Sequence, residues 1–197
     1  TAIATYLAIW FDRIAVVNTS FGRWHVSRET LEHPYSRQGI AMTFDYPEIN
    51  PFSDGTGSSL NMLDWVTRYI ESESSQPFIT VCNNAASGER SQFPDKYLTS
   101  VVTDPPYYDA VPYADLSDFF YVWQKRVLGN LYPLNFATPN TPKTEECTAL
   151  KHHHDGNIEK AKKHFEDKLL QIFDAIEHQT EDVVSILFAH QSTEAWT

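Results

Sequence analysis

Residues 97–107 read Tyr97-Leu98-Thr99-Ser100-Val101-Val102-Thr103-Asp104-Pro105-Pro106-Tyr107. The first seven are rich in β-branched and aromatic types, which predicts a short strand over Tyr97–Thr103. Two further short runs, Phe78–Cys82 and Val183–Ala189, are also bounded by turn or polar residues. Runs without regular polar alternation suit strands that are buried on both faces, as in a parallel sheet. We therefore expect a strand of a parallel sheet that ends directly before Asp104.

Helical patterns lie between the last two predicted strands. Apolar residues recur at helical spacing over Asp115–Leu128, where Gly129 marks the end, and again over Asn157–His178. The order strand, strand, helix, helix, strand is typical of a doubly wound sheet. The sequence therefore predicts an α/β fold with a partial doubly wound, Rossmann-like sheet.

The N-terminal part has a different character. Apolar residues on one face predict a helix over Thr1–Asn18, and a second helix begins at Ser58 or Ser59. Between these helices, Phe21–Gly39 is aromatic and carries three arginines, a composition that a phosphate backbone can attract.

This pattern divides the chain into a helical segment over residues 1–75 and a catalytic α/β part over residues 76–197. The sequence opens inside a helical pattern at Thr1, and Ser192–Thr197 resembles a helix start that is cut short. We therefore expect the α/β part to be an incomplete piece of a longer enzyme.

The composition excludes several classes of protein. Apolar residues make up 42% of the 197 residues, which excludes a disordered chain. A formal net charge of -11 argues against a free-standing nucleic-acid binder. Two cysteines, Cys82 and Cys147, cannot build a disulfide framework, and no apolar run reaches membrane-spanning length. These features predict no membrane contact and a reducing, cytoplasmic location.

The tetrapeptide after the predicted strand carries the most specific chemistry. Ligands of open α/β sheets bind at the carboxyl ends of strands, which is where Asp104 begins. Pro105 and Pro106 fix the backbone and remove two N–H donors, which leaves carbonyl groups to face outward. The Asp104 carboxylate and the Pro105 carbonyl can accept the two hydrogens of an exocyclic amine, while Tyr107 stacks on the planar ring. A base in a duplex would first have to leave the stack. For the bare tetrapeptide, a simple strand-ending turn is the alternative.

The motif resembles the catalytic motif of amino-group DNA methyltransferases, in which Asp, Asn or Ser precedes Pro-Pro and an aromatic residue. The longer run from Val101 to Trp123 resembles the large prokaryotic adenine-specific methylases that carry a domain of unknown function near their N-terminus. Three other stretches fit the same group: Phe44–Phe52, Thr141–Glu145 and Phe188–Trp196.

This resemblance implies an enzyme that transfers a methyl group from S-adenosylmethionine to the N6 amine of adenine in DNA. It implies Asp104, Pro105, Pro106 and Tyr107 as the catalytic residues. DNA would be bound through the full-length protein, because the acidic charge argues against these residues holding it unaided.

The methyl-donor loop of that family has the form Phe-x-Gly-x-Gly. Only Asn50–Gly57 comes near this form, with one residue too many between Phe52 and Gly55. A glycine turn before a capped helix explains the segment better, so we expect the main donor loop to be missing from this chain. Asn83 follows the run Phe78–Cys82 and can contact the adenine ring of the donor, or else begin a local turn.

Three further features have more than one interpretation. Tyr108 can form a wall of the base pocket or pack in the core. Lys143 lies in the long loop Asn130–Gly156, which can face the DNA substrate. The run His152–His154 suggests a metal, but three consecutive histidines do not converge easily on one ion, so we expect none.

Two other functions stay open on the sequence alone. The motif suits any planar amine, including cytosine N4, an RNA base or a protein side-chain amide. A methyltransferase-like half without its donor loop can also act as a non-catalytic binding module.

Overall fold

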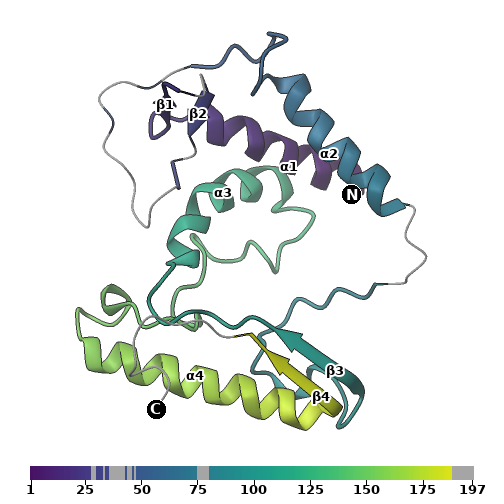
Figure 1. Ribbon diagram of the computed structural model, residues 1–197, viewed down its shortest axis with the longest axis vertical. Helices are drawn as coiled ribbons and strands as arrows, with labels where there is room; N and C mark the ends of the chain where they lie inside the picture. The colour runs from purple at the N-terminus through teal and green to yellow at the C-terminus, as the bar shows by residue number, and fades with distance from the viewer. Residues whose placement is uncertain are drawn as a thin grey trace. The chain divides into compact units, whose positions relative to one another are not determined.

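A computed structural model describes residues 1–27, 30–32, 34–35, 43, 46, 48–74 and 80–187 of the chain (Figure 1). The chain is a mixed α/β protein that folds as two compact units. Unit 1 comprises Thr1–Phe78 and Ala114–Thr141, and unit 2 comprises Ile79–Tyr113 and Pro142–Thr197.

Unit 2 contains a parallel pair of strands. Strand β3 (Leu98–Thr103) lies beside β4 (Thr180–Ile186), with Ser100 opposite Val183 and Val102 opposite Ser185 (Figure 1). Parallel neighbours need a long crossover, and the 22-residue helix α4 (Ile158–Gln179) runs directly into β4. The predicted strand before Asp104 and the parallel pairing are therefore confirmed. The expected burial of both strand faces is not, because six of the seven residues of β4 and three of the six residues of β3 are exposed.

Helix α4 forms where its sequence supplies both a cap and an apolar stripe. The Asn157 side chain accepts hydrogen bonds from the backbone N–H groups of Glu159 and Lys160, at 3.0 and 3.1 Å. Phe165 is buried on the inward face, where it forms a small core with Cys147 and Ala149. Tyr108, Leu169 and Ile172 pack against this core.

The prediction of a strand over Phe78–Cys82 is wrong for the part that the structure describes. Thr80–Cys82 forms no strand, and the Val81 side chain is 80% exposed. Strand propensity takes effect only where a neighbouring strand pairs with the run. The described residues of this run have no such neighbour, so their β-branched composition does not produce a strand. The first two residues of the run, Phe78 and Ile79, lie outside the described residues.

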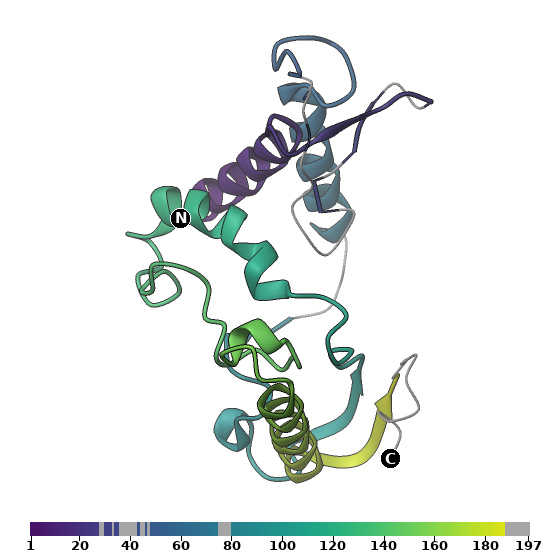
Figure 2. The same cartoon turned by 90° about the vertical axis from the view of Figure 1, so that its left-hand side faces the viewer.

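Unit 1 is built mainly from helices. Helices α1 (Ala2–Val17) and α2 (Ser59–Ser74) cross in Figure 2, and the Trp10 indole N–H donates to the Ser59 carbonyl at 2.8 Å. Helix α3 (Tyr113–Leu128) enters unit 1 at Ala114, and its Gln124 amide donates to the Asp12 carboxylate at 2.5 Å.

The two units differ from the predicted division at residues 75 and 76. The first boundary, at Phe78, lies close to it, but residues 114–141 belong to unit 1. The reason lies in the aromatic face of α3, because Trp123 packs edge-on against Phe11 with ring centroids 5.4 Å apart.

The connection Phe21–Gly39 contains a hairpin that periodicity did not predict. Strands β1 (Arg23–His25) and β2 (Thr30–Glu32) pair in antiparallel fashion, with Arg23 opposite Glu32. Arg23 forms an ion pair with Glu32, which raises the pKa of the guanidinium. This arginine is therefore already paired with an acid and contributes little net charge toward a phosphate.

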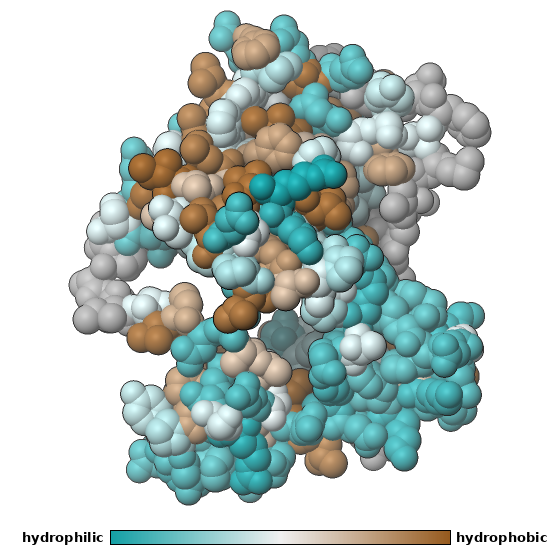
Figure 3. All heavy atoms as spheres, turned by 180° about the vertical axis from the view of Figure 1, so that it is seen from behind, coloured by the Kyte–Doolittle hydropathy of each residue, from teal (hydrophilic) through white to brown (hydrophobic). Residues whose placement is uncertain are grey.

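Apolar side chains also reach the surface. Figure 3 shows such residues gathered over the face of unit 1 that it displays. Helix α1 carries few polar residues, and the side chain of its Ile3 is 78% exposed. Within the described part of the chain, no helix has the length and apolar character needed to cross a membrane.

Replacement of Phe165 by Ala should lower the free energy of unfolding by about 3–5 kcal/mol, because it leaves a cavity between α4 and the buried Cys147 and Ala149. Urea denaturation followed by circular dichroism measures this loss. The matched control is Leu170→Ala on the same helix, where a 70% exposed side chain should change stability by less than about 0.5 kcal/mol. Equal losses in the two variants would contradict the assigned core.

Candidate functional site

The motif Asp104–Tyr107 follows the last residue of β3 without a gap. Asp104 is exposed, Pro105 is buried and Pro106 is half-buried. The Tyr107 hydroxyl donates a hydrogen bond of 2.5 Å to Oδ1 of Asp104, which raises the pKa of the phenol. The acid and the aromatic residue of the motif therefore lie at the carboxyl end of a parallel strand, within hydrogen-bonding distance of each other.

Tyr108 fixes the end of the motif. Its φ of +50° lies in the left-handed region, which is uncommon for a residue with a side chain. Its carbonyl accepts a hydrogen bond from Ala149 N–H at 2.9 Å, and its ring packs edge-on against Phe165 with centroids 5.1 Å apart. Of the two roles that the sequence left open, the structure places this ring against the core of unit 2.

A cavity of about 450 Å³ lies beside the motif in unit 2. Pro106 forms part of its wall, together with residues from the loop before β3, from the segment before α4 and from α4 itself. The lining residues are Ala86, Ser87, Gly88, Glu89, Pro106, Glu145, Cys147, Lys168, Gln171 and Ile172. Its volume falls within the range of small-molecule sites, which runs from about 300 to 1,000 Å³.

Charged and neutral groups share the cavity wall. Lys168 Nζ lies 2.5 Å from Oε2 of Glu145, and this hydrogen-bonded pair holds the pKa of the carboxyl below its usual range. Burial raises the pKa of the Cys147 thiol to about 11, so this group is a neutral part of the wall. At neutral pH the cavity therefore presents a paired acid and base beside a protonated thiol.

The structure brings only some of the predicted residues to this cavity. Pro106 lines it directly. Lys143 is half-buried and lies two residues before Glu145, which lines it, and Asn83 is exposed and lies three residues before Ala86. Sequence reasoning missed Lys168 and Gln171, whose i,i+3 spacing on one helix face was the available signal.

The glycine-containing segment Asn50–Gly57 belongs to unit 1. Gly57 adopts a φ of +90°, its N–H donates to the Asn61 side chain at 3.2 Å, and Ser58 Oγ accepts from the Asn61 N–H. These contacts are those of a turn that caps α2, in agreement with the interpretation that the sequence favoured. Glu48 and Ile49, the described residues directly before it, form no strand.

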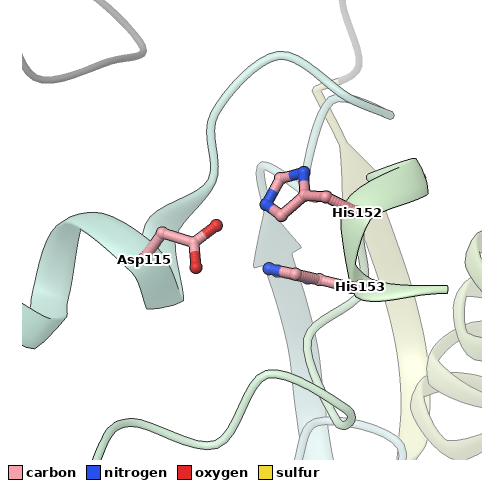
Figure 4. Close-up of side chains that lie close together, drawn as sticks. All are labelled: Asp115, His152 and His153. Carbon is pink, nitrogen blue, oxygen red and sulfur yellow. The ribbon is translucent and has the colours of Figure 1, made fainter. Parts of the chain in front are cut away.

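His152 and His153 lie on a short 3-10 helix, η2 (Lys151–His153), and His154 follows it directly. Figure 4 shows the side chains of His152 and His153 close together, with ring centroids 4.3 Å apart. Figure 4 also labels Asp115, which belongs to unit 1, whereas the histidines belong to unit 2. The expected lack of a metal stays a prediction.

His154, directly after η2, contacts His164 on α4. The ring of His154 lies 4.7 Å from that of His164, whose Nε2 is 2.9 Å from the Glu146 carbonyl. Partial burial, and after it the proximity of His164 and His153, lowers the pKa of His154. Protonation of this group is therefore less favourable in the folded chain than in the unfolded chain.

No known protein family, curated protein or solved structure matches the chain.

The two cysteines should differ sharply in reactivity. With a pKa of about 11, the buried Cys147 holds only about one thiolate in a thousand at pH 8, whereas Cys82 is exposed. Brief treatment with iodoacetamide should therefore label Cys82 and leave Cys147 unmodified, as measured by peptide mass spectrometry. In urea both should react, and rapid native labelling of Cys147 would contradict the closed wall.

Acidification should weaken unit 2 through His154. Its pKa is lowered in the folded state from 6.5, so the unfolded state binds more protons just below that pH. The contribution to stability is complete above about pH 6.5 and decreases as the pH falls toward the folded pKa. Urea denaturation at roughly pH 7.5 and 5.5 should show a smaller acid-induced loss in His154→Gln than in the parent chain. A loss of the same size in both would exclude His154 as the cause.

Proposed function

We propose that this chain carries the catalytic part of a DNA methyltransferase with a doubly wound, Rossmann-like fold. The reaction would move a methyl group from S-adenosylmethionine to the N6 amine of adenine. The single observation that carries this proposal is the position of Asp104-Pro105-Pro106-Tyr107, at the carboxyl end of a parallel strand beside a cavity of ligand size.

The chemistry of the motif suits a weakly nucleophilic amine. The Asp104 carboxylate and the Pro105 carbonyl would each accept one amine hydrogen, which favours a pyramidal nitrogen with its lone pair free. That lone pair would attack the methyl group that S-adenosylmethionine supplies, the rest of the donor would leave as a neutral thioether, and the amine would give up one proton to Asp104 or to water. Pro106 would keep the turn stiff, and Tyr107 would stack on the base after it leaves the duplex. Positioning and electrostatics supply the rate enhancement.

The cavity beside Pro106 is the proposed binding site of the methyl donor. S-adenosylmethionine, when bound, supplies the electrophilic methyl group. The cavity beside Pro106 has the volume for a small organic ligand, and Gln171 and Lys168 offer polar atoms at its wall. Asn83, three residues before the cavity-lining Ala86, would contact the adenine ring of the donor. The described residues of unit 2 include no glycine-rich loop of the Phe-x-Gly-x-Gly form, so donor binding would need residues outside the described part.

We propose adenine as the acceptor because the motif begins with Asp and ends with Tyr, the form most typical of adenine-N6 methyltransferases. Cytosine N4 and other planar amines present the same two hydrogens and are the alternative acceptors. The net charge of -11 argues against these residues holding DNA unaided.

Replacement of Asp104 by Ala in the full-length protein should reduce methylation at least about a hundredfold, because the amine loses its charged acceptor. The measurement is mass spectrometry of N6-methyladenine and N4-methylcytosine in DNA from cells that lack other amino-group methylases. Asp109→Ala is the matched control, since it removes another exposed carboxylate from the same loop. Undiminished methylation by Asp104→Ala would refute the proposal, and N4-methylcytosine as the product would change the acceptor.

A further inference from the structure

The Asp104 carboxylate already accepts a hydrogen bond in this structure. The Tyr107 hydroxyl donates to its Oδ1 at 2.5 Å, where Asp104 is exposed and Tyr107 is half-buried. We propose that Tyr107 competes with the substrate for Asp104, so that only a planar ligand with an N–H donor can displace the hydroxyl efficiently. This inference rests on the proposed function and adds to it a determinant of substrate specificity.

The backbone around Tyr107 leaves the side chain as the part that can move. Pro105 and Pro106 fix two φ angles in front of it. Behind it, the Tyr107 carbonyl accepts a hydrogen bond from Ala110 N–H at 2.8 Å, and the Tyr108 carbonyl is held by Ala149 N–H. With the turn closed on both sides, release of Asp104 requires rotation of the Tyr107 side chain and no rearrangement of the loop.

The phenol and an exocyclic amine can donate to the same oxygen of this carboxylate, the phenol through the shorter hydrogen bond. Each presents a hydrogen to a carboxylate oxygen, with the donor atom about 2.5–2.9 Å away. If an amine N–H donated to the same lone pair of Oδ1, its nitrogen would occupy the place where the Tyr107 oxygen now lies. The two contacts therefore exclude each other along that direction.

The same exchange would prepare the ring for stacking. While its hydroxyl is bound to Asp104, the Tyr107 ring is tied to the residue that must hold the amine. Once an amine takes over the carboxylate, the ring is released and can cover the face of the base. A planar ring without an amine would have to break the hydrogen bond between Tyr107 and Asp104 and would not replace it with another. Discrimination between such ligands should therefore exceed what stacking alone provides.

The first test asks whether the contact exists in solution. The 197-residue chain is labelled with tyrosine that carries carbon-13 at the ring carbon bearing the hydroxyl, and Tyr107→Phe identifies the resonance. The pKa of Tyr107 should be raised in the parent chain and should fall toward 10 in Asp104→Asn. Asp109→Asn, which removes the same charge two residues beyond Tyr107, should leave it raised. Identical titrations in Asp104→Asn and the parent chain would overturn the inference.

The second test asks whether an amine displaces the hydroxyl. Adenosine and purine riboside share the ring and the sugar, but only adenosine carries the amine. Adenosine should shift the Tyr107 resonance and lower its pKa, whereas purine riboside should need at least about tenfold more ligand. Tyr107→Phe keeps the ring but lacks the competing hydroxyl, so it should bind adenosine about three- to tenfold more tightly.

The outcomes separate this inference from the proposed function. If both nucleosides act equally, or if neither acts, competition by an amine is wrong even where Asp104→Ala abolishes methylation. If adenosine alone releases Tyr107 while Asp104→Ala still methylates DNA, the competition stands and the proposed catalytic role fails.

Discussion

The Tyr108 ring packs edge-on against Phe165, and this contact joins the loop after β3 to the helix that leads into β4. The hydrogen bond from Ala149 N–H to the Tyr108 carbonyl adds the segment before α4 to the same point. Three stretches that are far apart in the sequence therefore meet directly behind the motif. The position of Asp104 depends on this junction, because the carboxylate lies at the free end of a strand that is paired on one side only within the described residues.

Local sequence pattern predicted most of the elements that the structure shows. The asparagine cap and the apolar stripe located α4 to within one residue at each end, and the β-branched run located β3 to within one residue. Helix α3 begins two residues before the expected Asp115. Strand β4 begins three residues before the expected Val183, because Thr180 pairs with Leu98 and extends the ladder beyond the apolar run. These elements are fixed by interactions between residues close in sequence, or by a single pairing partner.

The errors arise where distant residues decide the outcome. Thr80–Cys82 has strand composition, but its described residues are not paired, and no property of the run itself encodes a neighbour. The cavity wall is formed in part by Lys168 and Glu145, which are 23 residues apart and meet only after α4 packs on the core. The motif could be recognised from its own four residues, whereas the contact from Tyr107 to Asp104 depends on a side-chain rotamer that sequence spacing does not specify.

The backbone of Tyr108 has a consequence for how this position can change over evolutionary time. A φ of +50° is easiest for Gly and tolerable for Asn or Asp, and it disfavours β-branched residues. The contact with Phe165, in contrast, requires a ring. No amino acid satisfies both demands without cost, since an aromatic residue here carries about 1–3 kcal/mol of backbone strain and Gly would leave Phe165 without its neighbour. Single substitutions at this position therefore exchange one defect for another, and a tolerated change would need a second one at Phe165.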